Sequence, residues 1–368
     1  MDKMMIMVVD GCAPEYLTRE TAPGLYALAG ELGFMKTVKS AIPSVTNVNH
    51  ACILSGRFPK DTGVVGNYYY KPETGEEGFI EERGFMQAET ILQAYKKAGK
   101  TTALLTVKGK VLGVYGDGAD TGISVQTPDP EVLKRLGLSQ PPKVQSPEST
   151  RWILEAALAC VKTEDPDLLY CTTNDYVFHH WGPGTAEAEE QIHWLDEYIC
   201  RIHQADPERR IYITADHGMN QKRHLINFQA MADRRGIRLY CLPPLKDRYI
   251  ENHIYQEGGI LYVFLKNEGE REAFLELAQS TPEIERVMES SQAAEAFHLP
   301  AGRIGDYVLL AAEDCAFGEV EGERLNTDAV RTHGSLYEQE IPLWTVHPQA
   351  SPERYQYSKD IAAIAMGI

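Results

Sequence analysis

The sequence has little that suggests a secreted or membrane-bound protein. Its seven cysteines form no CxxC pair, and their odd number and scattered positions argue against a disulfide framework. No apolar stretch approaches the length of a membrane span, and the short apolar run near the N-terminus is too brief for a cleavable signal peptide. We therefore expect a cytoplasmic protein with buried free thiols and no membrane partner.

Positive charge is also scarce. The chain has 36 Lys and Arg against 53 Asp and Glu, a formal net charge of -17. This excess argues against nucleic acid or an anionic membrane surface as the main partner. We expect a small-molecule partner, and if that molecule is an anion, metal ions or a few lysines must supply local positive charge. The sequence leaves open whether the chain forms a homodimer.

Apolar runs alternate with helical periodicity along the first part of the chain. The patterns predict strands at 4–9, 101–106, 167–172 and 210–215, and helices at 21–33, 88–98, 147–161 and 187–204. Strands that alternate with helices predict an α/β fold, a mainly parallel central sheet with helices on both faces. A late strand is expected at 341–346.

The pattern changes in the second half of the chain, where short strands and helices mix. We predict an inserted α+β cap at 226–322 and a discontinuous catalytic core made of 1–225 and 323–368. Residues 111–143 are rich in Gly and Pro and have weak periodicity, so a small insert in the core is expected there.

Acidic residues follow three of the predicted core strands, at Asp10, Asp175 and Asp216. Because the carboxyl ends of parallel strands meet at one edge of a sheet, these side chains should lie close together. A single Asp after a strand is more often a turn or cap residue. Three of them, two with histidines nearby, favour a shared site.

Histidines complete a metal-binding pattern. Asp175 and His179 are four residues apart, so one face of a helix can present both. His217 adjoins Asp216, and His333 stands just before the late strand. Oxygen and imidazole ligands without thiolate fit a catalytic zinc ion, although the ligand types alone also permit manganese or iron.

The other histidines are not expected to bind metal. His180 would point roughly 100° away from His179 on a helix, so a structural or substrate-facing position is expected. Ordinary surface or core positions are expected for His50, His193, His203, His298 and His347. His224 and His253 fall beside the predicted cap, where no role is favoured over a substrate contact.

The segment SAIPSVTNVNHACILSG at 40–56 places Thr46 between a turn and a predicted helix. In one interpretation, Thr46 simply caps that helix. In the other, it is a nucleophile, because a bound cation lowers the pKa of the hydroxyl and a helix N-terminus favours the resulting anion. On Thr46 alone the cap is favoured.

Taken together, the motifs resemble those of the alkaline phosphatase superfamily. The order VVDG, PSVTNxNHACILSGRFPxxTGVVGN, TTNDYxxHxxGP, TADHGM and THGS, within residues 5–335, is similar to the branch of nucleotide pyrophosphatase/phosphodiesterases and phosphonoacetate hydrolases. The resemblance implies two zinc ions, a phosphothreonine formed on Thr46, and a hydrogen bond from Asn67 to a phosphoryl oxygen. It assigns one ion to Asp175, His179 and His333, and the other to Asp10, Asp216, His217 and Thr46.

Two lysines bear on the substrate. By their residue type, Lys108 and Lys110 in LLTVKGKVLG are solvated lysines at a strand end. Their spacing, however, resembles the Lys-x-Lys that binds the substrate carboxylate in phosphonoacetate hydrolases. Cleavage of a C–P bond expels a carbanion that must delocalise into that carboxylate, and two ammonium groups would stabilise the growing charge. We therefore predict hydrolysis of phosphonoacetate to acetate and phosphate.

Two other functions stay open. A nucleotide pyrophosphatase or phosphodiesterase could use the same metal site, with Tyr68, Tyr69 and Tyr70 as an aromatic slot for a base, although ordinary half-buried packing of these rings is favoured. A catalytically inactive, metal-stabilised binding protein is disfavoured, because such a protein has no use for the nucleophile.

Overall fold

The computed structural model describes residues 2–248 and 254–368, so His253 lies outside the described residues. The largest sheet has seven strands in the order β2-β16-β8-β1-β7-β5-β6. These strands are β1 (Met4–Val8), β2 (Met35–Lys39), β5 (Thr102–Thr106), β6 (Thr121–Ser124), β7 (Leu168–Thr172), β8 (Arg210–Thr214) and β16 (Glu340–Val346).

Most neighbours in this sheet are parallel. β1 pairs in parallel with β7 and β8, and β5 does so with β6 and β7, whereas β16 runs antiparallel to β8 and β2. All residues of β1, β5 and β7 are buried, as expected for strands covered on both faces. The predicted, mainly parallel α/β fold is confirmed.

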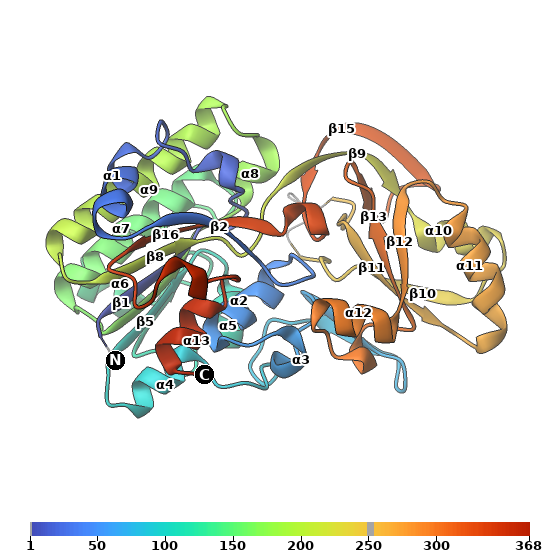
Figure 1. The fold of residues 1–368 in the computed structure, drawn as a ribbon, viewed down its shortest axis with the longest axis horizontal. Coiled ribbons are helices and arrows are strands. Elements are labelled where there is room, and N and C mark those ends of the chain that lie inside the picture. The colour runs from blue at the N-terminus through green and yellow to red at the C-terminus, as the bar shows by residue number, and fades with distance from the viewer. Residues whose placement is uncertain (1, 249–253) are drawn as a thin grey trace.

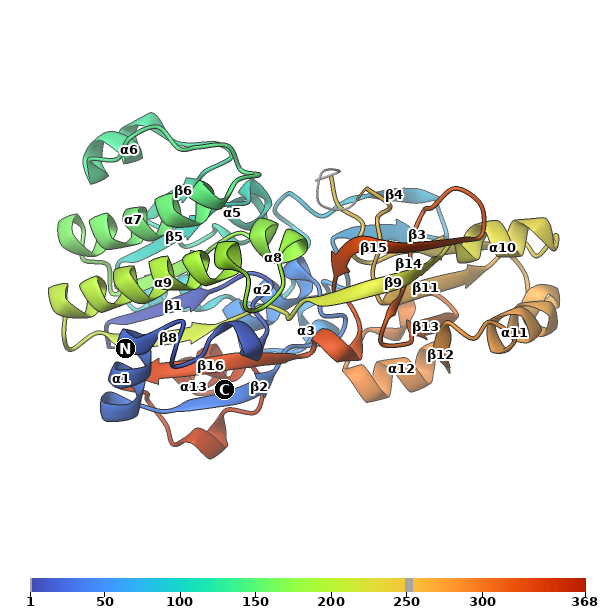
Figure 2. The same ribbon diagram turned by 90° about the horizontal axis from the view of Figure 1, so that it is seen from above.

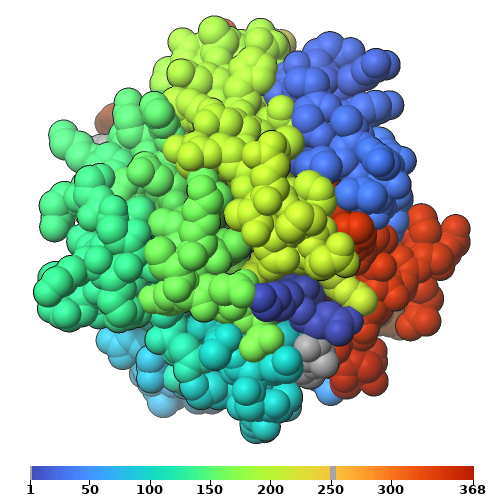
Figure 3. Space-filling model, turned by 90° about the vertical axis from the view of Figure 1, so that its left-hand side faces the viewer, coloured from blue at the N-terminus to red at the C-terminus, as the bar shows by residue number. Residues whose placement is uncertain are grey.

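Helices cover both faces of this sheet (Figures 1 and 2). One layer contains α1 (Pro23–Leu32), α6 (Pro130–Leu136), α7 (Pro147–Thr163), α8 (Tyr176–His180) and α9 (Ala186–Ala205). The other contains α2 (Thr46–Ser55), α3 (Pro59–Thr62), α4 (Ile91–Lys97), α5 (Gly109–Tyr115) and α13 (Asp360–Met366). Figure 3 views the molecule from the left-hand side of Figure 1, the end formed by the seven-stranded sheet and its helices. Early (blue) and late (red) segments lie side by side there, which agrees with the pairing of β2 with β16.

Residues 111–143 do not form a separate insert, so that prediction was wrong. They include β6, which pairs in parallel with β5 and forms an edge of the seven-stranded sheet. The sequence TGIS of β6 is short and contains a glycine, so it lacks the apolar run by which the other core strands are predicted.

A smaller α+β part lies beside the core in Figure 1. It has a four-stranded sheet in the order β10-β11-β13-β12 and a three-stranded sheet in the order β14-β9-β15. Its strands are β9 (Asn220–Ile226), β10 (Leu239–Leu242), β11 (Ile260–Leu265), β12 (Ile284–Glu289), β13 (Tyr307–Ala311), β14 (Cys315–Phe317) and β15 (Arg324–Thr332). Its helices are α10 (Phe228–Arg234), α11 (Arg271–Gln279) and α12 (Ser290–Phe297).

β9 and β15 pair with each other although most of their residues fall outside the predicted cap, 226–322. The hairpin of β3 (Tyr68–Lys71) and β4 (Glu76–Phe79) belongs to the core by sequence but packs against the cap sheet, with Tyr70 against Tyr240. The division into core and cap stays a prediction.

Short 3-10 helices occur at Pro14–Tyr16, Glu268–Glu270, Ala301–Arg303, Leu336–Glu338 and Pro352–Arg354.

All seven cysteines lie within the described residues, and each is a free thiol. Five are buried as predicted, and Cys200 and Cys241 are partly exposed. Among the described residues, no helix combines the length and apolar character that crossing a membrane requires.

Candidate metal centre and active site

Four neighbouring core strands end at the same level of the sheet. Val8 of β1 is in register with Thr172 of β7 and Thr214 of β8, and Thr172 is in register with Thr106 of β5. The predicted site residues that directly follow these ends are Asp10, Asp175, Asp216, His217 and Lys108. Because the strands are parallel, four segments far apart in sequence deliver polar side chains to one edge.

Two sets of buried ligand-type side chains gather at this edge. In each set the ligand atoms lie within 4.8 Å of one another: Asp175, His179 and His333 in one, and Asp10, Asp175 and His217 in the other. Asp216 joins the second set, since its Oδ2 is 3.3 Å from Nε2 of His217. The structure therefore brings all the predicted metal ligands together, and Asp175 is common to both sets.

The three imidazoles make the same kind of hydrogen bond to the backbone. Nδ1 lies 2.7 Å from the carbonyl oxygen of Arg331 in His179, 2.9 Å from that of Gly218 in His217, and 2.7 Å from that of Ser44 in His333. A carbonyl only accepts hydrogen bonds, so each Nδ1 donates and each Nε2 is directed toward the site. Histidines that ligate metals are held in this way.

His217 shows why a metal ion fits this site. Its Nε2 lies 3.3 Å from Oδ2 of Asp216 and 3.5 Å from Oδ1 of Asp10. Burial lowers the pKa of His217 to about 4, so at neutral pH its Nε2 carries no hydrogen. Acceptor atoms that face one another in a buried site repel unless a proton or a metal cation lies between them. These three residues therefore fit a divalent cation.

One buried ammonium group compensates the carboxylates. Nζ of Lys108 lies 2.9 Å from Oδ2 of Asp10 and 2.8 Å from Oδ2 of Asp175. Burial opposes the charge on Lys108, but the two carboxylates raise the pKa of this lysine well above its ordinary value. Lys108, predicted to contact the substrate, therefore lies among the predicted metal ligands, and it is not a solvated lysine.

Lys110 has a different partner. It stands in the first turn of α5, and its Nζ lies 2.6 Å from Oδ2 of Asp247, in the loop after β10. Both side chains are buried, so the pair links the core to this loop. Asp247 was not foreseen, because no spacing in LPPLKDR relates it to Lys110 or to a metal.

Thr46 is the first helical residue of α2, and its N-cap is Val45, so the interpretation of Thr46 as a helix cap was wrong. Its Oγ1 lies 3.3 Å from Nε2 of His217, inside the second ligand set. The N-terminus of a ten-residue helix favours negative charge at this oxygen. The preceding turn is fixed by Ser44, whose Oγ donates to the carbonyl of Ser335 at 2.7 Å.

Asn67 is hydrogen-bonded to Asn47, the residue that follows the candidate nucleophile Thr46. Its Oδ1 accepts a hydrogen bond from the backbone N–H of Asn47 at 3.2 Å, and its Nδ2 donates to the carbonyl of Leu245 at 3.2 Å. Nδ2 carries a second hydrogen, which it can donate in a hydrogen bond to an oxygen atom bound beside Thr46.

His50 is the residue that the sequence analysis underrated. It is fully buried on α2, and its Nε2 lies 3.9 Å from Oδ2 of Asp216. A signal was present in the sequence, because His50 follows Thr46 by four residues and therefore shares its face of the helix. His180 is exposed and bonds the carbonyl of Tyr176, and His224 bonds Asn326 on β15.

The three consecutive tyrosines pack against other rings. The ring centroids are 4.9 Å apart for Tyr68 and Phe79, 5.0 Å for Tyr69 and Phe85, and 4.3 Å for Tyr70 and Tyr240. The packing agrees with ordinary half-buried rings, although Tyr69 and Tyr70 also line a cavity of about 570 Å³.

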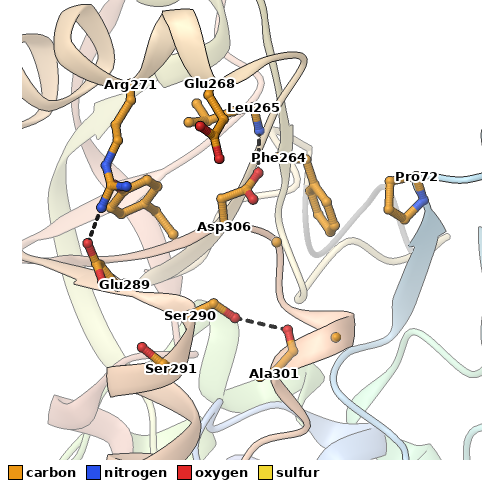
Figure 4. A pocket seen from close by; sticks show the side chains of 13 residues that line it. Pro72, Phe264, Leu265, Glu268, Arg271, Glu289, Ser290, Ser291, Ala301 and Asp306 are labelled. Carbon is orange, nitrogen blue, oxygen red and sulfur yellow. Dashed lines mark hydrogen bonds and ion pairs between the residues drawn. The ribbon is translucent and has the colours of Figure 1, made fainter.

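A cavity of about 670 Å³ lies in the α+β part, around α11 and the start of α12 (Figure 4). Arg271 is paired with Glu289 across it, and Asp306 accepts a hydrogen bond from the backbone of Leu265. None of its lining residues is a predicted site residue. A cavity of about 110 Å³, lined in part by His179 and Glu257, borders the first ligand set.

Comparison with known proteins agrees with this geometry. The chain is 26% identical over 247 residues to an ectonucleotide pyrophosphatase/phosphodiesterase of Caenorhabditis elegans, covering 64% of this chain and 31% of that protein. It is 24% identical over 319 residues to human ectonucleotide pyrophosphatase/phosphodiesterase family member 7, covering 81% and 63%. The chain thus spans less than two thirds of the length of these curated relatives.

Solved structures are similar over nearly their whole length. Phosphonoacetate hydrolase from Sinorhizobium meliloti 1021, in complex with phosphonoacetate, has a TM-score of 0.87 at 27% identity, with 100% of this chain and 95% of that chain covered. Murine ectonucleotide pyrophosphatase/phosphodiesterase 5 shares the fold, with a TM-score of 0.71 at 17% identity and coverage of 100% and 94%. The sequence model for type I phosphodiesterase / nucleotide pyrophosphatase matches residues 4–336. The chain therefore belongs to the type I phosphodiesterase / nucleotide pyrophosphatase family.

Proposed function

We propose that this protein is a metal-dependent hydrolase that cleaves the C–P bond of phosphonoacetate, giving acetate and phosphate. The observation that carries the proposal is the buried ammonium group of Lys108, which lies within 3 Å of two candidate metal-ligand carboxylates. A second buried lysine, Lys110, follows two residues later. A phosphodiester substrate has no carboxylate for such cations to bind.

Two zinc ions would be held by the two ligand sets. Asp175, His179 and His333 would hold one ion, and Asp10, Asp216, His217 and Thr46 the other. When bound, the ions supply positive charge that lowers the pKa of a hydroxyl and stabilises charge on the phosphoryl group. Two divalent ions would balance the three aspartates and an alkoxide on Thr46, so a site in an acidic protein can accept an anion.

In the proposed reaction, Oγ1 of Thr46 forms a bond to phosphorus and the C–P bond breaks. The electron pair of that bond passes to the methylene carbon and is delocalised into the carboxylate, and a proton from water completes acetate. Water then cleaves the phosphothreonine and releases phosphate. Asn67 would donate a hydrogen bond to a phosphoryl oxygen throughout, since Thr46 and the partner of Asn67, Asn47, are adjacent.

The lysines would act on the leaving group. The carboxylate of the substrate gains negative charge as the C–P bond breaks, so ammonium groups beside it bind the transition state more strongly than the ground state. The similarity to phosphonoacetate hydrolase over the whole chain, including the cap region, supports this substrate.

The second candidate is a nucleotide pyrophosphatase or phosphodiesterase at the same metal site. The family model and the names of the curated relatives favour it. Tyr68, Tyr69 and Tyr70 pack against neighbouring rings, but Tyr69 and Tyr70 also line a cavity of about 570 Å³, which would have room for a base.

A lysine variant separates the two candidates. We expect Lys108→Met to lower kcat/KM for phosphonoacetate by about 10²-fold or more, as the loss of a donor to developing charge does. Cleavage of bis-p-nitrophenyl phosphate should change less than about threefold, since its leaving group has no carboxylate. Phosphate and nitrophenol release are measured on protein whose zinc content has been determined.

The matched control is Lys100→Met, at the opposite end of β5, where Lys100 pairs with Asp167. It should leave both activities unchanged. Equal losses on both substrates in Lys108→Met would mean that Lys108 serves the metal ligands or the fold, and the phosphonoacetate proposal would fail.

Zinc binding should depend on pH. Burial, together with the charges of Asp175 and Asp216, raises the pKa of Asp10 to about 8. Below this pH the metal-free site holds a proton that zinc must displace, so affinity should rise by up to about tenfold per pH unit between pH 6 and 8 and then level off. Calorimetric titration in buffers of different protonation enthalpy measures both affinity and protons released. Affinity that is constant over this range would contradict the role of Asp10.

A further inference from the structure

Helix α2 contacts two adjacent residues of the metal site with two of its own side chains. Thr46 and His50 are four residues apart and share one face of the helix. Oγ1 of Thr46 lies 3.3 Å from Nε2 of His217, and Nε2 of His50 lies 3.9 Å from Oδ2 of Asp216. The helix that presents the candidate nucleophile therefore also places a side chain beside the candidate metal ligand Asp216.

His50 is itself held from the central sheet. Its Nδ1 lies 2.5 Å from the hydroxyl of Tyr170 on β7, and the two rings meet edge to face with centroids 5.8 Å apart. Both side chains are fully buried. The chain of contacts therefore runs from the sheet through Tyr170 and His50 to Asp216.

The contact with Tyr170 determines which hydrogen His50 presents to Asp216. If the Tyr170 hydroxyl donates to Nδ1, the hydrogen of the neutral imidazole is on Nε2, which points to the carboxylate. The other tautomer would set the lone pair of Nε2 against Oδ2 of Asp216, and two acceptors repel. In the neutral ring, Nε2 is therefore the donor that faces Asp216.

Asp216 is otherwise fixed through its other oxygen. Oδ1 accepts hydrogen bonds from the backbone N–H of Gly11 at 3.1 Å and of His217 at 3.0 Å. Within the described part of the chain, Oδ2 of Asp216 and Nε2 of His50 are both buried without a hydrogen-bond partner. They face each other at slightly more than hydrogen-bond distance, so a small shift joins them.

We propose that His50 and Tyr170 are positioning residues, which orient the carboxylate of Asp216 for metal binding through a hydrogen bond from His50 Nε2. The inference rests on the metal-binding part of the proposed function and is independent of the substrate. Carboxylates that ligate metals are commonly held by hydrogen bonds of this kind, and losing the partner typically costs about 10- to 100-fold in metal affinity.

The test measures zinc affinity by chelator competition on the full-length metal-free protein. We expect Tyr170→Phe and His50→Met to weaken one of the two bound zinc ions by about 10- to 100-fold. His50→Gln should restore affinity to within about threefold of the wild type, because the Gln amide nitrogen can take the place of Nε2 as a donor.

The matched control is Tyr115→Phe. Tyr115 is another buried tyrosine, and its hydroxyl donates to the backbone carbonyl of Asn47 on the same helix at 2.7 Å; among the described residues it makes no hydrogen bond to His50 or Asp216. It should keep wild-type zinc affinity. Equal weakening in Tyr115→Phe, or wild-type affinity in His50→Met, would overturn the inference while leaving the proposed function intact. A wild-type protein that binds no zinc would overturn both.

Discussion

Replacing Thr46 with alanine is expected to abolish turnover while the protein still binds both metal ions. Thr46 supplies the oxygen atom that bonds to phosphorus. In its absence, no side chain at position 46 holds a water molecule in the same place to attack phosphorus instead. We expect kcat to fall by on the order of 10³-fold or more, as for other enzymes that lose a covalent nucleophile. The metals should remain, because Asp10, Asp216 and His217 still surround the second site.

The measurement combines steady-state rates with zinc content and mass spectrometry of the protein, digested after a rapid acid quench. In the wild type, the peptide that contains Thr46 should carry the added mass of a phosphoryl group, and in Thr46→Ala it should not. Thr46→Ser keeps a hydroxyl at the helix N-terminus and should retain part of the activity. Ser55→Ala removes another buried hydroxyl from α2, one that donates to the carbonyl of Ala51 and accepts from the backbone N–H of Arg57, and should have little effect on turnover. Substantial activity in Thr46→Ala would disprove the role of nucleophile.

The metal centre could be predicted from the sequence because its geometry follows from the core strands. Continuous apolar runs identified β1, β7 and β8, and parallel pairing then brings Asp10, Asp175 and Asp216 to one edge whatever the loops do. The spacing of Asp175 and His179 needed only one helical turn, which α8 supplies. His333 could be proposed only through the family motif, since it arrives from β15, outside the core sheet.

The contacts of single side chains could not be predicted. The pairing of Lys110 with Asp247 depends on how the loop after β10 folds over α5, and the sequence has no local pattern for it. The position of Lys108 between two carboxylates follows from electrostatics in a buried site, because uncompensated carboxylates there are costly. The edge strand β6 was missed for a different reason. Its four residues have no strand pattern of their own, and β6 is recognised as a strand only by its pairing with β5.

Replacing Asp175 with asparagine is expected to cause the largest loss of metal binding. Asp175 belongs to both ligand sets, so a neutral amide at this position weakens both sites at once. Zinc content should fall from two ions toward none at micromolar free zinc, and turnover should fall with it by at least about 10³-fold. His179→Ala should affect chiefly the first ion, because His179 belongs to one set alone.

Thermal unfolding distinguishes this effect from simple misfolding. In the metal-free protein, burial and then charge repulsion from Asp175 raise the pKa of Asp10, and both carboxylates contact Lys108. Asp175→Asn relieves that repulsion while weakening one contact of Lys108, so the unfolding temperature without metal should change little. The stabilisation that zinc confers, about 4 kcal/mol per site at a thousandfold excess over Kd, should largely disappear.

Asp167→Asn, at the other end of β7, should keep the zinc effect intact, because Asp167 bonds only Lys100, Thr101 and the backbone among the described residues. If zinc stabilises Asp175→Asn as strongly as the wild type, the ions do not lie between these two ligand sets.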